Sequence, residues 1–259
     1  MTMPEADLQL FALRGLPNIQ QGDDLAALIA EALRLNGLRL QKGDILVITS
    51  KIVSKAEGRL VDLRTVQPSE QAQQLAEQTG KDPRLVELVL REAQGISRVG
   101  AKVIITRHRL GFVSANSGVD QSNVRGDDDW ALLLPENPDR TARQLRERLS
   151  ALCGVAPAVI LSDTHGRPHR FGNIGVAIGV AGIPALLNLR GRADLFGRRL
   201  QHTEIGLADE LAAAAELISG QAAEGLPVVL IRGYRLPEGV PSDGNAADLY
   251  RPPHMDLYG

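Results

Sequence analysis

An apolar run that ends abruptly in polar, reactive residues is the strongest guide to the fold of this chain. The run Ala158–Leu161 is typical of a buried strand, and the segment SDTHGRPHRFGN, residues 162–173, follows it directly. A strand end holds a side chain rigidly, and an open sheet offers its ligand crevice at the carboxyl ends of its strands. We therefore expect Asp163 to be held at the end of this strand and exposed by the loop that follows.

A second segment, residues 113–123, has the same character. Small residues lead there to Asp120 and Asn123. Two carboxylates on separate loops of short residues suggest a site for a hard cation, because magnesium and manganese favour one or two carboxylates and keep several waters. The alternative for each aspartate taken alone is a turn or a helix cap, which is common for Asp among Gly and Ser.

Hydrophobic periodicity predicts the remaining elements. Strands are expected at 8–13, 44–50, 102–106, 111–115, 158–161, 174–180 and 227–232, and helices at 25–36, 68–79, 83–94, 141–152 and 207–219. Residues 51–58 are expected to form a polar loop. Because strands and helices do not alternate strictly, we predict an α+β (mixed α/β) fold with mixed or antiparallel sheets and flanking helices.

Glycine alternates with aliphatic residues along 174–180, which predicts a strand packed closely against other backbone. No phosphate-loop motif G-x-x-x-x-G-K-[ST] occurs in the chain. No sharp linker divides it either, so we predict a single module with, at most, two subdomains divided near residues 127–137. The three acids Asp127, Asp128 and Asp129 are expected to form a solvated turn.

Composition excludes several classes of protein. A net charge of -2 and an aromatic content of 3% argue against nucleic-acid binding. The single cysteine, Cys153, cannot form an internal disulfide, which is typical of a reducing compartment. With no apolar run long enough for a membrane span and no signal-like start, we expect a cytoplasmic protein without membrane partners.

Five blocks in order resemble the coenzyme F-420 gamma-glutamyl ligase family. They are GLPNI at 15–19, TSKIVSKAEGR at 49–59, SGVDQSN at 117–123, SDTHGRPHR at 162–170 and LADELAAAAELISG at 207–220. The resemblance implies the fold of that family, a homodimer, and the stand-alone form without a carboxyl-terminal flavin-type domain.

The same resemblance implies the site residues. Asp120, Asp163 and Lys55 would have catalytic roles. Asp120 and Asp163 would bind one divalent ion, magnesium or manganese, and Thr164 a second, together with an acid before the Ala-rich segment. Glu204 is the first choice for that acid, ahead of Asp209 and Glu210, and potassium is a further candidate ion. The residues implied for GTP are Leu16, Pro17, Asn18, Ile19, Ser50, Lys51, Lys55 and Asn123.

The activity implied is carboxylate activation. GTP would phosphorylate the carboxyl group of a deazaflavin precursor, and the amine of L-glutamate would attack the acyl phosphate to form an amide. Two alternatives stay open: a two-metal phosphate-ester hydrolase and a non-catalytic nucleotide- or deazaflavin-binding protein. His165 and His169 do not suggest a helical zinc site, because Gly166 and Pro168 lie between them. The family usually has other residues at both positions, so neither imidazole is expected to be essential.

Overall fold

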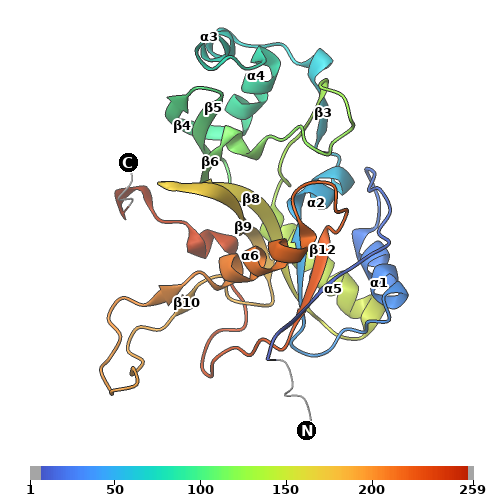
Figure 1. The fold of residues 1–259 in the computed structure, drawn as a ribbon, viewed down its shortest axis with the longest axis vertical. Coiled ribbons are helices and arrows are strands. Elements are labelled where there is room, and N and C mark those ends of the chain that lie inside the picture. The colour runs from blue at the N-terminus through green and yellow to red at the C-terminus, as the bar shows by residue number, and fades with distance from the viewer. Residues whose placement is uncertain (1–6, 256–259) are drawn as a thin grey trace.

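The computed structural model describes residues 7–255 of the chain and is built around a mixed five-stranded sheet (Figure 1). Its strands, in spatial order, are β1 (Gln9–Ala12), β12 (Val228–Arg232), β2 (Ile45–Thr49), β8 (Ala158–Arg167) and β9 (Arg170–Ala181). β2 and β8 are parallel, and the other neighbours are antiparallel. The predicted mixed α+β class is therefore confirmed.

Helices cover both faces of this sheet. On one face α1 (Leu25–Leu35) and α5 (Pro138–Cys153) pack against Leu46 and Ile48 of β2. On the other face α6 (Leu207–Ser219) packs against Ile45 and Val47. Successive side chains of a strand point to opposite faces, so a strand buried on both faces is a continuous apolar run, as β2 is from Ile45 to Ile48.

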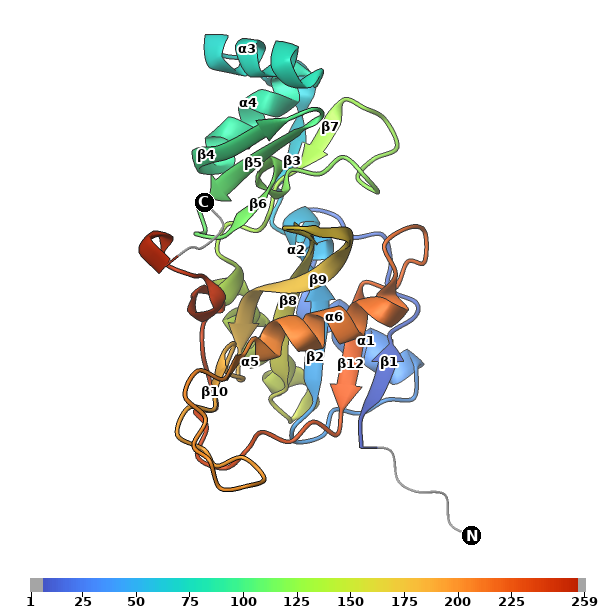
Figure 2. The ribbon, with the colours of Figure 1, turned by 60° about the vertical axis from the view of Figure 1, so that its left-hand side comes forward.

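A second part of the molecule lies beside one end of the sheet (Figures 1 and 2). Helices α3 (Glu70–Thr79) and α4 (Pro83–Glu92) pack there with a small sheet of β4 (Ala93–Gly100), β5 (Val103–His108) and β6 (Val113–Ala115), next to the pair β3 (Leu60–Asp62) and β7 (Trp130–Leu132). The division of the chain into subdomains near residues 127–137 remains a prediction. A further two-stranded antiparallel sheet is formed by β10 (Leu187–Asn188) and β11 (Glu204–Ile205).

Two glycines of β9 let the sheet approach its covering helices closely, as the alternation of glycine with aliphatics predicted. A Cβ atom on Gly175 would lie 2.8 Å from the carbonyl oxygen of Ala212 in α6. On the other face, a Cβ atom on Gly179 would lie 2.6 Å from the carbonyl carbon of Pro138 in α5. Backbone atoms cannot move aside as a side chain can, so only glycine fits at these two positions.

Most predicted elements are present, but two regions differ from the prediction, and the strands β3, β4, β7, β10 and β11 were missed. Residues 51–58 were predicted as a polar loop, but most of them belong to α2 (Ser50–Ala56), whose Ile52 and Val53 are buried. β8 does not end at Leu161 but continues through Asp163 to Arg167, because β9 pairs with it along that length. β4 was not predicted, since most of its residues are exposed and it carries no apolar alternation.

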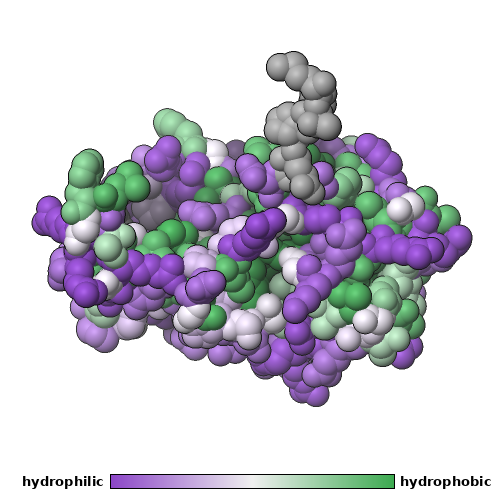
Figure 3. All heavy atoms as spheres, turned by 90° about the horizontal axis from the view of Figure 1, so that it is seen from below, coloured by the Kyte–Doolittle hydropathy of each residue, from purple (hydrophilic) through white to green (hydrophobic). Residues whose placement is uncertain are grey.

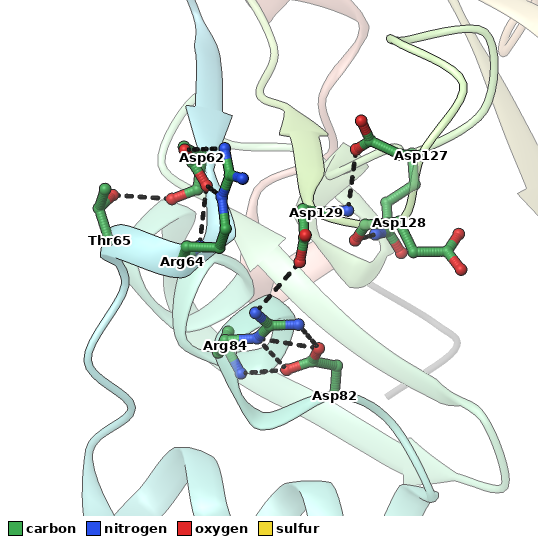
Figure 4. Close-up of polar contacts among 9 residues, drawn as sticks. Asp62, Arg64, Thr65, Asp82, Arg84, Asp127, Asp128 and Asp129 are labelled. Atoms are coloured by element: carbon green, nitrogen blue, oxygen red, sulfur yellow. Dashed lines mark hydrogen bonds and ion pairs between the residues drawn. The ribbon is translucent and has the colours of Figure 1, made fainter.

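The acidic turn at 127–129 lies on the surface, as predicted (Figure 4). Asp127 and Asp128 are exposed, and Asp127 Oδ1 accepts a hydrogen bond from the backbone of Asp129. Asp129 lies 3.4 Å from the guanidinium of Arg84, which also pairs with Asp82. These acids are thus used in local surface contacts. None of the helices described is long and apolar enough to cross a membrane.

Candidate functional site

A cavity of about 850 Å³ lies at the carboxyl end of β2, beside residues 162–164 of the neighbouring strand β8 and the loop that follows β6. This is within the usual size of a small-molecule or cofactor site. Five stretches of the chain provide most of its lining, together with Asn173: residues 16–19, 49–55, 115–123, 162–164 and 215–227. Every residue predicted for GTP lines it, as do Asp120, Asp163 and Thr164.

Helix α2 connects the two predicted carboxylates through consecutive residues. Ser50 Oγ lies 3.1 Å from Asp163 Oδ1 and donates a hydrogen bond to it. Lys51 Nζ lies 2.7 Å from Asp120 Oδ2 and also donates to the backbone oxygen of Ser122. The helix begins directly at the end of β2, so the strand sets the position of both contacts. Two aspartates 43 residues apart in the sequence are thereby brought to one cavity.

The buried hydroxyl of Ser117 anchors the loop that carries Asp120. Ser117 is fully buried, donates to the carbonyl oxygen of Val89, and lies 2.7 Å from Thr106 Oγ1. Its backbone is left-handed, as is that of Gly118, where a Cβ atom would lie 2.6 Å from Leu134. The loop therefore has a conformation that the surrounding packing fixes, which suits a residue that must present a carboxylate.

The charges in the cavity perturb one another. Burial alone would raise the pKa of Asp120, but the ammonium of Lys51 and the hydrogen bonds from Ser122 lower it below its usual value. Burial lowers the pKa of Lys55, and the charge of nearby Lys51 lowers it further. Lys55 donates to the carbonyl oxygen of Asn123 and forms no ion pair within residues 7–255. An anion beside Lys55 would relieve this repulsion between the two cations.

The segment 219–227, which follows α6, lines the cavity but was not predicted as part of the site. Asn123 Nδ2 donates to the carbonyl oxygen of Ala222, so this segment meets the Asp120 loop. In the same region Thr164 Oγ1 donates to Glu216 Oε1 at 2.7 Å. In the sequence, only the glycines at 220 and 225 hinted that this segment is a loop near a site. Its place at the cavity follows from the topology, because β12 is antiparallel to β2 and so begins where β2 ends.

Glu204 lies elsewhere. It belongs to β11, its carboxylate is 2.7 Å from the guanidinium of Arg190, and it is not among the residues that line the cavity. Asp209 accepts a hydrogen bond from the backbone of Ala177, and burial raises its pKa. Two arginines near these segments, Arg190 and Arg167, are not among the residues that line the cavity. Arg190 pairs with Glu204, and Arg167 donates to the backbone oxygen of Phe171.

The donors that face the cavity fit a hydrated hard cation. They are the carboxylates of Asp120 and Asp163 and the hydroxyl of Thr164, all oxygen ligands of the kind that magnesium and manganese prefer. Within residues 7–255, no three His, Cys, Asp or Glu side chains gather closely enough to hold a metal ion. A site of this kind would leave most ligand positions to water or to substrate oxygens.

Two lysines, two aspartates and a hydroxyl around one cavity at the edge of a mixed sheet have the chemistry of a site for an anionic ligand and a cation. The comparisons with known proteins specify it further. A family model described as F420-0:Gamma-glutamyl ligase matches residues 15–233. The chain belongs to this family and is a ligase that forms an amide bond.

Curated relatives match along most of their length. The chain is 48% identical over 252 residues to the coenzyme F420:L-glutamate ligase of Methanothermobacter thermautotrophicus, covering 97% of this chain and 98% of the relative. It is 50% identical over 242 residues to the protein of the same name from Methanopyrus kandleri, covering 93% of each. The like-named protein of Methanocaldococcus jannaschii is 46% identical over 219 residues, 85% of this chain and 86% of the relative.

Proposed function

We propose that the protein adds L-glutamate to the carboxyl group of a deazaflavin precursor of coenzyme F420, with GTP as the phosphoryl donor. The observation that carries the proposal is the placement of Lys51 and Lys55 with Asp120 and Asp163 around one cavity. Lys55 forms no ion pair among the described residues, and the charge of Lys51 acts on it. A polyphosphate would balance both cations, since ammonium groups are common phosphate ligands.

The chemistry follows from the weakness of a carboxylate as an acyl donor. An oxygen of the substrate carboxylate attacks the γ-phosphorus of GTP, the bond to the bridging oxygen breaks, and GDP leaves. The glutamate amine then attacks the acyl carbon of the acyl phosphate, loses a proton, and expels inorganic phosphate as the amide forms. The protein mainly positions the reactants and offsets charge, which explains a site rich in cations and carboxylates.

Each side chain has a role in this scheme. Lys51 and Lys55 hold the phosphates, and Asn123, which lines the cavity where two loops meet, contacts the nucleotide. Asp120, Asp163 and Thr164 would hold divalent magnesium or manganese, with potassium as an accessory ion. When bound, the divalent ions would neutralise charge between the two anionic substrates. For the second ion we propose Glu216 in addition to Glu204, because Thr164 donates directly to it.

The test is to incubate the protein with deazaflavin precursor, L-glutamate, GTP and Mn²⁺, and to follow glutamyl addition and GDP by mass spectrometry. We expect product and GDP in equal amounts, and loss of both in Asp163→Asn. Phosphate release that needs no amine would favour the two-metal hydrolase. Nucleotide binding without GDP formation for any acceptor would favour a non-catalytic binding protein.

We also propose that the protein acts as a homodimer. Phe171, near the start of β9, and Leu195 and Phe196, between β10 and β11, are almost fully exposed. On the face seen from below, hydrophobic residues lie scattered among hydrophilic ones (Figure 3). Burial of these three side chains against a second copy of the chain would remove their apolar surface from water and so favour association. Light scattering should give twice the mass of the chain, and Phe196→Ser with Phe171→Ser should shift it toward the monomer.

A further inference from the structure

His165 contacts the carboxylate that the proposed function places at the centre of the site. The two residues are two apart on β8, in a stretch where pairing with β9 is regular, so both side chains lie on the same face. His165 Nε2 lies 3.0 Å from Asp163 Oδ2. A carboxylate that binds a cation can only accept a hydrogen bond, so in that role Asp163 accepts and Nε2 of His165 is the donor.

The second oxygen of the same carboxylate is also held. Asp163 Oδ1 accepts from Ser50 Oγ at 3.1 Å. One donor on each oxygen fixes the plane of the carboxylate and its rotation about the side-chain bond. Each oxygen retains a second lone pair, and these remain available to a ligand in the cavity that Asp163 lines. This is the arrangement by which neighbouring groups orient a metal-binding carboxylate.

Packing immobilises the imidazole. The ring of Phe112 packs on it with centroids 5.1 Å apart, and the His165 side chain is only 12% exposed. Phe112 is itself buried, stacked on His108 at 4.9 Å and edge-on to Tyr250 at 5.6 Å. An imidazole fixed by packing can set the orientation of the carboxylate to which it is hydrogen-bonded. An exposed imidazole would instead rotate with that carboxylate.

We infer that His165 is a positioning residue that holds Asp163 in the orientation needed to bind a divalent cation. The inference rests on the proposed function and deepens it, because the sequence alone gave His165 no essential role. His165 is not among the residues that line the cavity, so the inferred role is not one of direct contact with cation or substrate. It acts through the hydrogen bond to Asp163, so replacing the donor should weaken metal binding without changing the fold.

The experiment measures Mn²⁺ affinity directly, from the electron paramagnetic resonance signal of the free ion, with no substrate present. His165→Phe keeps a ring against Phe112 and removes the donor, and we expect it to weaken binding about tenfold. His165→Leu, a second donor-free side chain, should show the same loss. His165→Gln, whose amide nitrogen can replace Nε2, should recover affinity to within about threefold. His202→Phe makes the same change at an exposed histidine and should bind as the wild type does.

Asp163→Asn separates the possible outcomes. Weak binding in Asp163→Asn together with undiminished binding in both His165→Phe and His165→Leu would overturn the inference and leave the proposed site intact. Equal affinity in the wild type and in Asp163→Asn would mean that the proposed metal site itself is wrong, and the inference would fall with it. Thermal unfolding of each variant shows that it is folded, and turnover should show a lower kcat with an unchanged KM for the deazaflavin precursor.

Discussion

The Nζ atom of Lys51 lies 2.7 Å from Oδ2 of Asp120, and this contact joins the helix after β2 to a loop 69 residues further along the chain. Neither side chain is fully buried, with 28% of Lys51 and 42% of Asp120 exposed. The pair is therefore worth little to the stability of the fold, as is usual for partly exposed ion pairs. Its importance lies in holding an ammonium and a carboxylate together at the mouth of the cavity.

Replacing Lys51 should impair turnover far more than folding. In Lys51→Met the cavity loses one of two cations that face the proposed phosphates, so we expect kcat/KM for GTP to fall about a hundredfold, equivalent to ~3 kcal/mol. The unfolding midpoint should hardly change. Lys42→Met, at an exposed lysine away from the cavity, is the matched control and should keep full activity. A Lys51→Met enzyme within threefold of the wild type would argue against phosphate contact.

Glu216 and Glu204 can be compared directly as the acid for a second divalent ion. Glu216 accepts from Thr164 inside the cavity, whereas Glu204 pairs with Arg190 outside it. We therefore expect Glu216→Gln to raise the Mn²⁺ concentration needed for half-maximal turnover about tenfold, and Glu204→Gln to change it much less. The reverse order of the two effects would favour Glu204 as the ligand.

Local signals carried most of the fold prediction. The helix at 207–219 is found with the predicted bounds, because its apolar spacing and the glycine that follows it are both local features. α2 was missed because a seven-residue helix with two lysines and two serines has little periodicity to detect. The extension of β8 through Asp163 depends on pairing with β9, which no property of residues 162–167 alone reveals.

The residues that the family resemblance implied lie around one cavity, whereas neighbours of that cavity that only topology reveals were missed. Asp120, Asp163, Lys51 and Lys55 meet at one cavity, as the resemblance suggested. The segment 219–227 reaches the same cavity because β12 runs antiparallel to β2, and that depends on the order of strands in space. The contact of His165 with Asp163 is similarly invisible in the sequence, since the spacing of two along a strand is informative only once the strand is known.

The close approach of β9 to α6 predicts a strong effect of a single methyl group. In Gly175→Ala the new Cβ atom would lie 2.8 Å from the backbone oxygen of Ala212, so the helix or the strand must shift. We expect a loss of ~2 kcal/mol in the free energy of unfolding, measured by urea denaturation. Gly95→Ala is the control, because nothing lies within 4 Å of the added atom there. Equal stability of the two variants would contradict the tight packing.

Glu92 should make the free energy of unfolding depend on pH. Its carboxylate lies 2.9 Å from Arg59, 3.0 Å from Arg109 and 3.5 Å from His108. Burial alone would raise the pKa of Glu92, but the neighbouring His108 and the charges of both arginines lower it to about 2. The unfolded chain, with an ordinary pKa of 4.5, therefore takes up a proton more readily than the folded protein between these values. The contribution of Glu92 is complete above the unfolded pKa and is lost as the pH falls toward 2.

Glu92→Gln tests this linkage. At pH 7 the variant should be less stable by ~3 kcal/mol, because two arginines lose a buried partner. The difference between wild type and variant, measured by urea denaturation from pH 7 to pH 3, should narrow below about pH 4.5, where protonation removes the same charge from the wild type. Glu31→Gln removes a carboxylate from the exposed pair with Arg34 and should leave the unfolding midpoint unchanged. If the difference for Glu92→Gln stays constant down to pH 3, the stabilisation comes from packing of the side chain, and its ionised carboxylate contributes nothing.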